Sequence, residues 1–200
     1  MIASEAVGHY EIVAGVDEAG RGPLAGPVVA AAVILGDDVP AGLGDSKQKS
    51  ARQRERLFEA LTATACAIGI GLANVREIES LNILQATLVA MQRAVEDLSH
   101  PPDRIVVDGT YCPCVPCPAT ALVGGDAKVP SISAASIVAK VTRDRLMLEL
   151  DARYPEYGFA RHKGYPTAEH LSALERCGIT AEHRRTFGPV RRMISAAGLP

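Results

Sequence analysis

Four acidic residues stand at or just beyond segments that have the character of buried strands. They are Asp17, Glu18, Asp108 and Asp126. In an open α/β sheet the ends of the strands gather around one crevice, so carboxylates far apart in the sequence can converge there. We therefore expect these four side chains to share one site at the edge of a sheet.

Carboxylates that converge repel one another. Two unit charges about 4 Å apart cost about 4 kcal/mol at an effective dielectric of about 20. Protonation, a basic neighbour or divalent cations can offset this cost. Mg²⁺ and Mn²⁺ favour oxygen ligands and keep positions open for water and phosphate, which is the protein side of two-metal phosphodiester hydrolysis. From spacing alone, an ordinary role as a turn residue or helix N-cap stays open for each acid.

The segments that must position these acids alternate between strand and helix patterns. Alternating and β-branched runs predict five strands, at residues 11–17, 28–35, 67–75, 105–109 and 120–123. Apolar residues at helical spacing predict helices after Ser50, at residues 83–98 and at residues 133–154, and a further helix and a basic last helix follow. Because no repeat or linker interrupts the pattern, we expect one α/β domain over residues 1–200, an open sheet covered by helices.

Charge is distributed unevenly along the 200 residues. The formal net charge is −2, but residues 1–139 carry 10 basic and 16 acidic side chains, whereas residues 140–200 carry 11 basic and 7 acidic ones. The basic excess of the last 61 residues fits either a solvated face or a surface that contacts a polyanion. The apolar fraction of 48% is enough for one continuous core.

Neither a membrane span nor a leader is expected. The apolar run at residues 27–35 is far shorter than the roughly 18 residues that a spanning helix needs. Glu5 stands early, and no basic segment leads into an apolar one. We therefore expect a cytoplasmic protein.

Three of the five cysteines crowd together, at Cys112, Cys114 and Cys117. A structural zinc site needs four ligands, and the other two cysteines, Cys66 and Cys177, stand alone in segments expected to be helical. We interpret the cluster as reduced, partly buried thiols in a loop. A zinc or redox centre stays open as the remote alternative.

Beyond composition, seven blocks of this sequence resemble, in order, the motifs of the bacterial ribonuclease HII family, over about residues 11–193. The blocks are Val16-Asp17-Glu18-Ala19-Gly20-Arg21-Gly22-Pro23-Leu24-Ala25-Gly26-Pro27, Asp45-Ser46-Lys47, Val107-Asp108-Gly109, Gly125-Asp126, Ser133-Ala134-Ala135-Ser136-Ile137-Val138-Ala139-Lys140-Val141-Thr142-Arg143-Asp144, His162-Lys163-Gly164-Tyr165 and His183-Arg184-Arg185-Thr186-Phe187. Several such blocks in the right order are far more specific than a lone Asp-Glu pair.

The resemblance implies a ribonuclease H-like fold, a mixed five-stranded sheet flanked by helices, with a helical substrate-binding part at about residues 155–200. It implies that the four acids are catalytic and bind two divalent cations, Mn²⁺ or Mg²⁺. The implied enzyme is an endonuclease that hydrolyses the RNA strand of RNA/DNA hybrids and nicks 5′ of single ribonucleotides in duplex DNA. Its products carry 3′-hydroxyl and 5′-phosphate ends, as ribonucleotide excision repair and DNA replication require.

The same resemblance assigns residues that bind the substrate. Gly20, Arg21 and Gly22 match a turn whose backbone contacts the ribose 2′-hydroxyl, the group that distinguishes RNA from DNA. Glycines allow the main chain to approach a sugar closely. Tyr165 matches a tyrosine that packs against the RNA-to-DNA junction. The basic residues expected near phosphates are Lys47, Lys140 and Arg184, although a surface or helix-capping role stays open for the last two.

Two departures from the family pattern and two rival functions complete the sequence-based interpretation. Residues 110–114 replace an Asn and a polar residue that are common in relatives, and Thr186 replaces a usual Ser. One rival is a nuclease for DNA junctions that uses the same acids without sensing ribose. The other is a module that binds hybrids without cutting them. No clamp-binding peptide is recognised at the C-terminus, and we expect a monomer.

Overall fold

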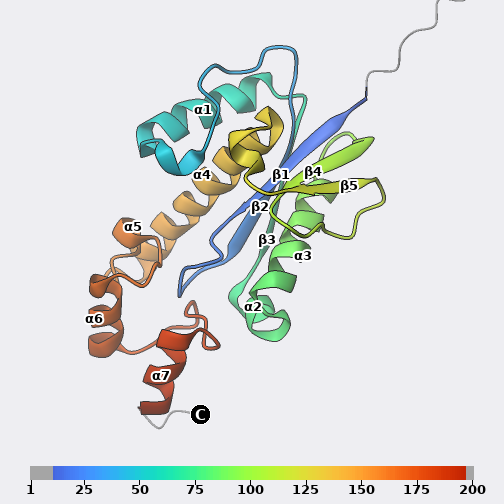
Figure 1. Ribbon diagram of the computed structural model, residues 1–200. Coiled ribbons are helices and arrows are strands. Elements are labelled where there is room, and N and C mark those ends of the chain that lie inside the picture. Colours follow the sequence, from blue (N-terminus) through green and yellow to red (C-terminus); the bar gives the residue numbers. More distant parts are fainter. Residues whose placement is uncertain (1–10, 197–200) are drawn as a thin grey trace, which may run out of the picture.

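A five-stranded mixed sheet forms the centre of the computed structural model, which describes residues 11–196 (Figure 1). Its strands are β1 (Val13–Ala19), β2 (Val28–Ile34), β3 (Ala67–Ala73), β4 (Arg104–Asp108) and β5 (Ala119–Leu122). They lie in the order β3-β2-β1-β4-β5. The pairs β1–β2 and β2–β3 are antiparallel, and the pairs β1–β4 and β4–β5 are parallel. The predicted mixed five-stranded sheet is therefore confirmed.

Helices cover both faces of this sheet (Figure 1). On one face α1 (Ala51–Thr64) and the long helix α4 (Pro130–Arg153) pack against Ala31 and Val33 of β2. On the other face α3 (Ile83–Glu96) packs against β1, β2 and β3. The approach of α4 to β1 requires Gly15, because a Cβ atom there would lie 2.1 Å from the backbone carbon of Ser131.

The last quarter of the chain forms a second, smaller core at one end of the sheet. It contains α5 (Phe159–His162), α6 (Ala168–Cys177) and α7 (Gly188–Ala196), which pack on the end of α4 and on the β1–β2 connection through Leu24 and Ala25. Because the β1–β2 connection belongs to this core, the C-terminal helices are fixed next to the turn that follows β1.

The predicted elements agree with the observed ones except at a few boundaries and for short helices that were not predicted. The first strand is shifted and ends at Ala19, so Asp17 and Glu18 lie within it rather than at its end. The long helix begins at Pro130, in the first turn where proline is favoured. Helix α2 (Val75–Leu81) was not predicted, although Asn74 and Glu77 form a capping box at its start.

Within the described residues, no helix is both long and apolar enough to cross a bilayer. The residues on which the expectation about a leader depends, including Glu5, lie outside the described part of the chain, as do residues 197–200.

Candidate active site

Three of the four predicted acids converge. Asp17, Asp108 and Asp126 each offer an oxygen atom, and these atoms all lie within 4.8 Å of one another. The sheet brings the first two together, because Val16 pairs with Val107 in the parallel β1–β4 ladder and each Asp is the next residue. Asp126 comes from a short 3₁₀ helix, Gly125–Ala127, which the backbone of Gly125 ties to Asp108 by an N–H···Oδ1 hydrogen bond of 2.7 Å.

Glu18 lies beside this trio rather than within it. Glu18 lines a cleft of about 390 Å³ together with Asp17 and Asp108. It also faces a neighbouring groove that contains Asp108 and Tyr111. Its Oε1 atom lies 3.3 Å from a guanidinium nitrogen of Arg21. The cleft is lined by Asp17, Glu18, Ala19, Gly20, Arg21, Gly22, Ser46, Lys47, Arg54, Asp108, Ser136, Lys140, Arg143 and Tyr165.

The protein environment disfavours the charged forms of two of these acids. Burial raises the pKa of Asp17 well above its usual value, and the neighbouring charge of Glu18 raises it further. Hydrogen bonds from Ser136 and from the backbone N–H of Glu18 oppose this increase in pKa. Burial also raises the pKa of Glu18, whereas Arg21 lowers it. Clustered carboxylates of this kind are stabilised by a divalent cation, and an all-oxygen donor set suits Mg²⁺ or Mn²⁺.

Lys47 is the basic residue that reaches toward the acids with its side chain free in solvent. Its Nζ atom lies 4.0 Å from Oδ2 of Asp126, and its side chain is 79% exposed. Two hydrogen-bonded contacts hold the loop that carries Lys47. Asp45 caps the 3₁₀ helix Ser46–Gln48, and Ser46 shares a 2.9 Å hydrogen bond with Ser136 of α4. The predicted position of Lys47 near a phosphate is compatible with this geometry.

Lys140 also lines the cleft, but it already has an ionic partner. Its Nζ atom donates a 2.7 Å hydrogen bond to Asp144, one helical turn along α4. Arg54 lies 3.5 Å from the other oxygen of Asp144 and donates to the carbonyl of Ser46 at 3.1 Å. Sequence reasoning missed Arg54, since nothing in a helix-forming segment distinguishes it from other surface arginines.

Next to the acids lie the turn and the tyrosine that were predicted to contact the sugar. Gly20 has φ +99°, and a Cβ atom there would lie 2.0 Å from Nε of Arg143, so only glycine fits. A Cβ atom on Gly22 would lie 3.5 Å from Cε1 of Tyr165, which places the tyrosine ring beside the turn. The Tyr165 side chain is among the exposed large hydrophobic groups, at 43%.

Arg184 is not on the surface of the cleft. It is fully buried, and its guanidinium donates to the carbonyl oxygens of Gly20 at 2.7 Å, Arg21 at 3.0 Å and Gly26 at 2.8 Å. It therefore supports the turn from behind instead of facing a phosphate. Burial lowers its pKa to about 9.

Arg143 is a second buried arginine with the same function, and sequence reasoning did not select it. Its guanidinium donates to the carbonyl oxygens of Ala25, Pro27 and Lys163 at 3.0–3.1 Å. Burial lowers its pKa to about 10. Arg143 thus joins the segment after the turn to the segment that carries Tyr165. The only available signal was its place in the motif at residues 133–144.

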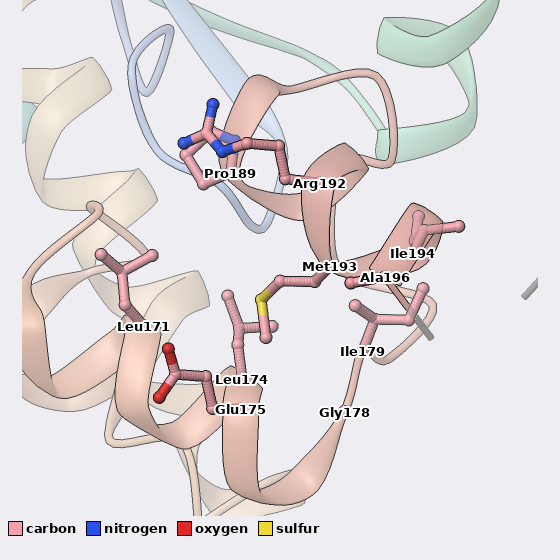
Figure 2. Close-up of a pocket in the computed structure, with 10 residues that line it drawn as sticks. All are labelled: Leu171, Leu174, Glu175, Gly178, Ile179, Pro189, Arg192, Met193, Ile194 and Ala196. Carbon is pink, nitrogen blue, oxygen red and sulfur yellow. The ribbon is translucent and has the colours of Figure 1, made fainter. Parts of the chain in front are cut away.

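Other surface features lie apart from this cleft. Figure 2 shows an apolar pocket of about 660 Å³ between α6 and α7, lined by Leu171, Leu174, Ile179 and Met193 among others, which shares no lining residue with the carboxylate cleft. The five cysteines are free, and Cys112 and Cys117 pack against the core. No described cysteine belongs to a group of three potential metal ligands.

Comparison with known proteins links this chain to one family. The family model described as ribonuclease HII matches residues 14–190. A protein named ribonuclease HII from Coxiella burnetii is 56% identical over 183 residues, which cover 91% of each chain. The crystal structure of ribonuclease H2 from Pyrococcus horikoshii has a TM-score of 0.76 at 30% identity and covers 92% of this chain and 97% of that one. A structure of Bst-RNase HIII in complex with Mn²⁺ has the same fold, with a TM-score of 0.72 at 16% identity, and covers 94% of this chain and 70% of that one.

Proposed function

Because the chain belongs to the ribonuclease HII family and is thus an endoribonuclease H that acts on RNA/DNA hybrids, we propose that it also nicks duplex DNA on the 5′ side of single embedded ribonucleotides. The products would carry 3′-hydroxyl and 5′-phosphate ends. The observation that carries this proposal is that Asp17, Glu18 and Asp108 line one cleft together with the Gly20–Gly22 turn and Tyr165. Asp126 offers an oxygen within 4.8 Å of those of Asp17 and Asp108.

In this proposal Asp17, Asp108 and Asp126 hold two divalent cations, with Glu18 as the fourth catalytic acid beside them. When bound, Mg²⁺ or Mn²⁺ ions neutralise charge on the phosphate and act as Lewis acids in hydrolysis. The donor set supports this choice, since every ligand is a carboxylate oxygen. The positions of the carboxylates determine where the cations would lie. A hydrogen bond from Ser136 orients Asp17, and the N–H group of Gly125 orients Asp108.

The turn can recognise a ribose through its backbone. The carbonyls of Gly20 and Arg21 point at the buried guanidinium of Arg184. In a trans peptide the C=O and N–H groups point in opposite directions, so the N–H groups of Arg21 and Gly22 point away from Arg184. We propose that they face the cleft and bind the 2′-hydroxyl, while the ring of Tyr165 packs on the adjacent deoxyribose.

Basic side chains would hold the substrate backbone. Lys47 has an exposed ammonium group 4.0 Å from Asp126, and Lys140 lies deeper in the same cleft. Residues 140–200, with 11 basic and 7 acidic side chains, would supply further contacts from α5, α6 and α7. We assign Arg184 to support of the turn rather than to a phosphate contact.

The experiment that tests this proposal uses a labelled DNA duplex with one ribonucleotide, assayed in Mg²⁺ and in Mn²⁺. We expect a single nick 5′ of the ribonucleotide and no cut in the all-DNA duplex of the same sequence. Equal cleavage of both duplexes would favour the rival nuclease for DNA junctions. No cleavage of either duplex in both ions would overturn the proposal.

A variant separates catalysis from binding. Asp108→Asn should abolish the nick and leave duplex binding intact, because it removes a metal ligand but no phosphate contact. Asp38→Asn, which changes an exposed loop acid, is the matched control and should cleave normally. If Asp108→Asn still cleaved as wild type, the acids would not be catalytic, as in the rival module that binds hybrids without cutting.

We also propose a setting for this activity. The enzyme would act as a monomer in the cytoplasm, on ribonucleotides left in the chromosome by replication, and would start their excision repair. Gel filtration with light scattering would test whether the protein is a monomer. Deletion of its gene should raise the ribonucleotide content of chromosomal DNA relative to the parent strain.

A further inference from the structure

Three buried histidines come together beneath the segment that carries Tyr165. His162, His170 and His183 are 8%, 0% and 1% exposed. The rings of His162 and His170 are stacked with centroids 4.5 Å apart, and the Nε2 atoms of His170 and His183 lie 3.1 Å apart. The ring of Phe159 packs against all three histidines. The active-site chemistry proposed above does not use this cluster.

The hydrogen-bond partners determine where each proton lies in the linked pair. His183 accepts at Nδ1 from the backbone N–H of Thr180 at 3.0 Å, so its proton is on Nε2. His183 then donates to Nε2 of His170, which leaves the His170 proton on Nδ1. That Nδ1–H group donates to the carbonyl oxygen of Tyr165 at 3.0 Å. The result is a directed chain from Thr180 through two neutral imidazoles to Tyr165.

The third histidine holds the same segment from the other side. His162 accepts at Nδ1 from the N–H group of Gly164 at 3.1 Å and donates from Nε2 to the carbonyl of Tyr157 at 2.8 Å. Its own carbonyl accepts the N–H group of Tyr165 at 2.9 Å. The N–H group of Tyr165 is thus bonded to the backbone of His162, and its carbonyl accepts from the His170 ring and from the N–H group of Thr167 at 2.8 Å.

The cluster is also connected to the turn that reads the sugar. Leu24, just after the turn, donates its N–H to the carbonyl of Gly164 at 2.8 Å and accepts from the N–H of Arg184 at 2.8 Å. Arg184 directly follows His183 in the chain and binds the turn carbonyls. The two elements proposed to contact the substrate thus rest on one continuous network.

We propose that His170 and His183 are positioning residues that hold the Tyr165 ring against Gly22 and thereby set the preference for an isolated ribonucleotide over a continuous hybrid. This inference rests on the proposed function, since it assumes that Tyr165 contacts the RNA-to-DNA junction. The physical reason is that Tyr165 is 43% exposed while its N–H and carbonyl groups are both hydrogen-bonded, so its backbone determines where the ring lies. Neither histidine touches the substrate.

The tautomers can be measured in the unaltered protein. In ¹⁵N-detected NMR spectra of the imidazole rings, we expect His170 to carry its proton on Nδ1 and His183 to carry its proton on Nε2. His170 protonated on Nε2 instead would overturn the directed chain, whatever the variants do.

Variants test the consequence for specificity. His170→Phe keeps an aromatic ring but removes both nitrogen atoms, so we expect kcat/KM on the embedded ribonucleotide to fall about ten-fold and kcat/KM on a continuous hybrid to change less than two-fold. His170→Asn can keep a donor close to the Nδ1 position and should restore most of the ratio. His100→Phe, at an exposed histidine, is the matched control and should leave the ratio unchanged.

Two further arms keep the test decisive. In a Tyr165→Ala background, His170→Phe should no longer change the ratio, because the side chain that it positions is absent. If His170→Phe does not fold, His183→Asn carries the test, since it keeps an acceptor for Thr180 and loses only the donor to His170. An unchanged ratio in a folded variant, or equal losses on both substrates, would overturn the inference. Failure of the wild-type chain to nick the embedded ribonucleotide would instead overturn the proposed function.

Discussion

Replacing Asp17 with asparagine should stabilise the metal-free protein and inactivate the enzyme. Asp17 is 5% exposed, and its carboxylate lies within 4.8 Å of oxygen atoms of Asp108 and Asp126. Its pKa is raised well above the usual value by burial and by Glu18. Asparagine removes the charge but keeps an oxygen that can accept the 2.7 Å hydrogen bond from the Glu18 N–H group.

The size of the gain follows from the distances. At 4.8 Å, each carboxylate pair costs about 3.5 kcal/mol at an effective dielectric of about 20. Partial protonation already relieves some of this cost, and the new amide nitrogen needs a partner. We therefore expect a net gain of about 2 kcal/mol in the free energy of unfolding at neutral pH, or a rise in Tm of about 4–8 °C for a chain of this size.

The pH dependence has a defined sign. An acid with a raised pKa destabilises the folded state at pH values above that pKa, and the penalty is relieved as the pH falls through it. The stability difference between Asp17→Asn and wild type should therefore shrink as the pH falls from neutral through the raised pKa of Asp17. Adding Mn²⁺ should reverse the order, since a cation that binds only the folded wild type stabilises it.

The assay combines thermal unfolding in EDTA and in Mn²⁺ with cleavage of the embedded-ribonucleotide duplex. Cleavage should fall more than about 100-fold, because even groups that only orient metal ligands are worth 10- to 100-fold. Asp38→Asn, at an exposed position, should change neither readout. A variant that is less stable than wild type in EDTA, or that cleaves normally, would refute the proposed electrostatics of the site.

Three further predictions concern the supporting network. Burial and His170 lower the pKa of His183 to about 3, so below pH 6.5 the unfolded chain takes up a proton that the folded chain does not. In urea titrations, this group should lower the free energy of unfolding by about 2 kcal/mol between pH 7 and pH 5. Arg184→Lys should lower the free energy of unfolding by about 3 kcal/mol or more, because the three N–H groups of an ammonium share one nitrogen and cannot match carbonyls placed for the planar guanidinium fork. Gly20→Ala should abolish the ribonucleotide preference in the cleavage assay and lower Tm, whereas Gly42→Ala, also at positive φ but with open space around it, should cost only about 1–2 kcal/mol.

Sequence reasoning could predict the elements and the acids because both depend on local pattern. Buried strands ending near a carboxylate are visible in the sequence, and the convergence of Asp17 with Asp108 follows once β1 and β4 are neighbours. Helix α2 was missed because it has only seven residues, too few for helical periodicity to stand out. Its capping box was the available signal.

The network behind the site could not be predicted, because its partners are backbone groups. Arg143, Arg184 and the three histidines recognise carbonyl and N–H groups, which every residue has, so no pairing of side-chain types indicates them. Arg184 was therefore expected near a phosphate, the common partner of an arginine in a nucleic-acid enzyme. Only its burial distinguishes support of the turn from contact with the substrate.

Burying the charged side chains of Arg143 and Arg184 behind the turn costs free energy, and this cost indicates that the turn needs rigid support. Burial lowers the pKa of both guanidinium groups, and every hydrogen bond that they donate within the described residues ends on a carbonyl oxygen rather than on a carboxylate. A site that recognises a hydroxyl rejects a substrate without it only if its donors cannot turn to other partners. The planar fork of arginine can hold several carbonyls in fixed directions, and the opposite N–H groups are then fixed as well. Variants such as Arg184→Lys leave all four acids in place but no longer fix the directions of the N–H groups of the turn. We therefore expect them to lower the ratio of cleavage at ribose to cleavage at deoxyribose.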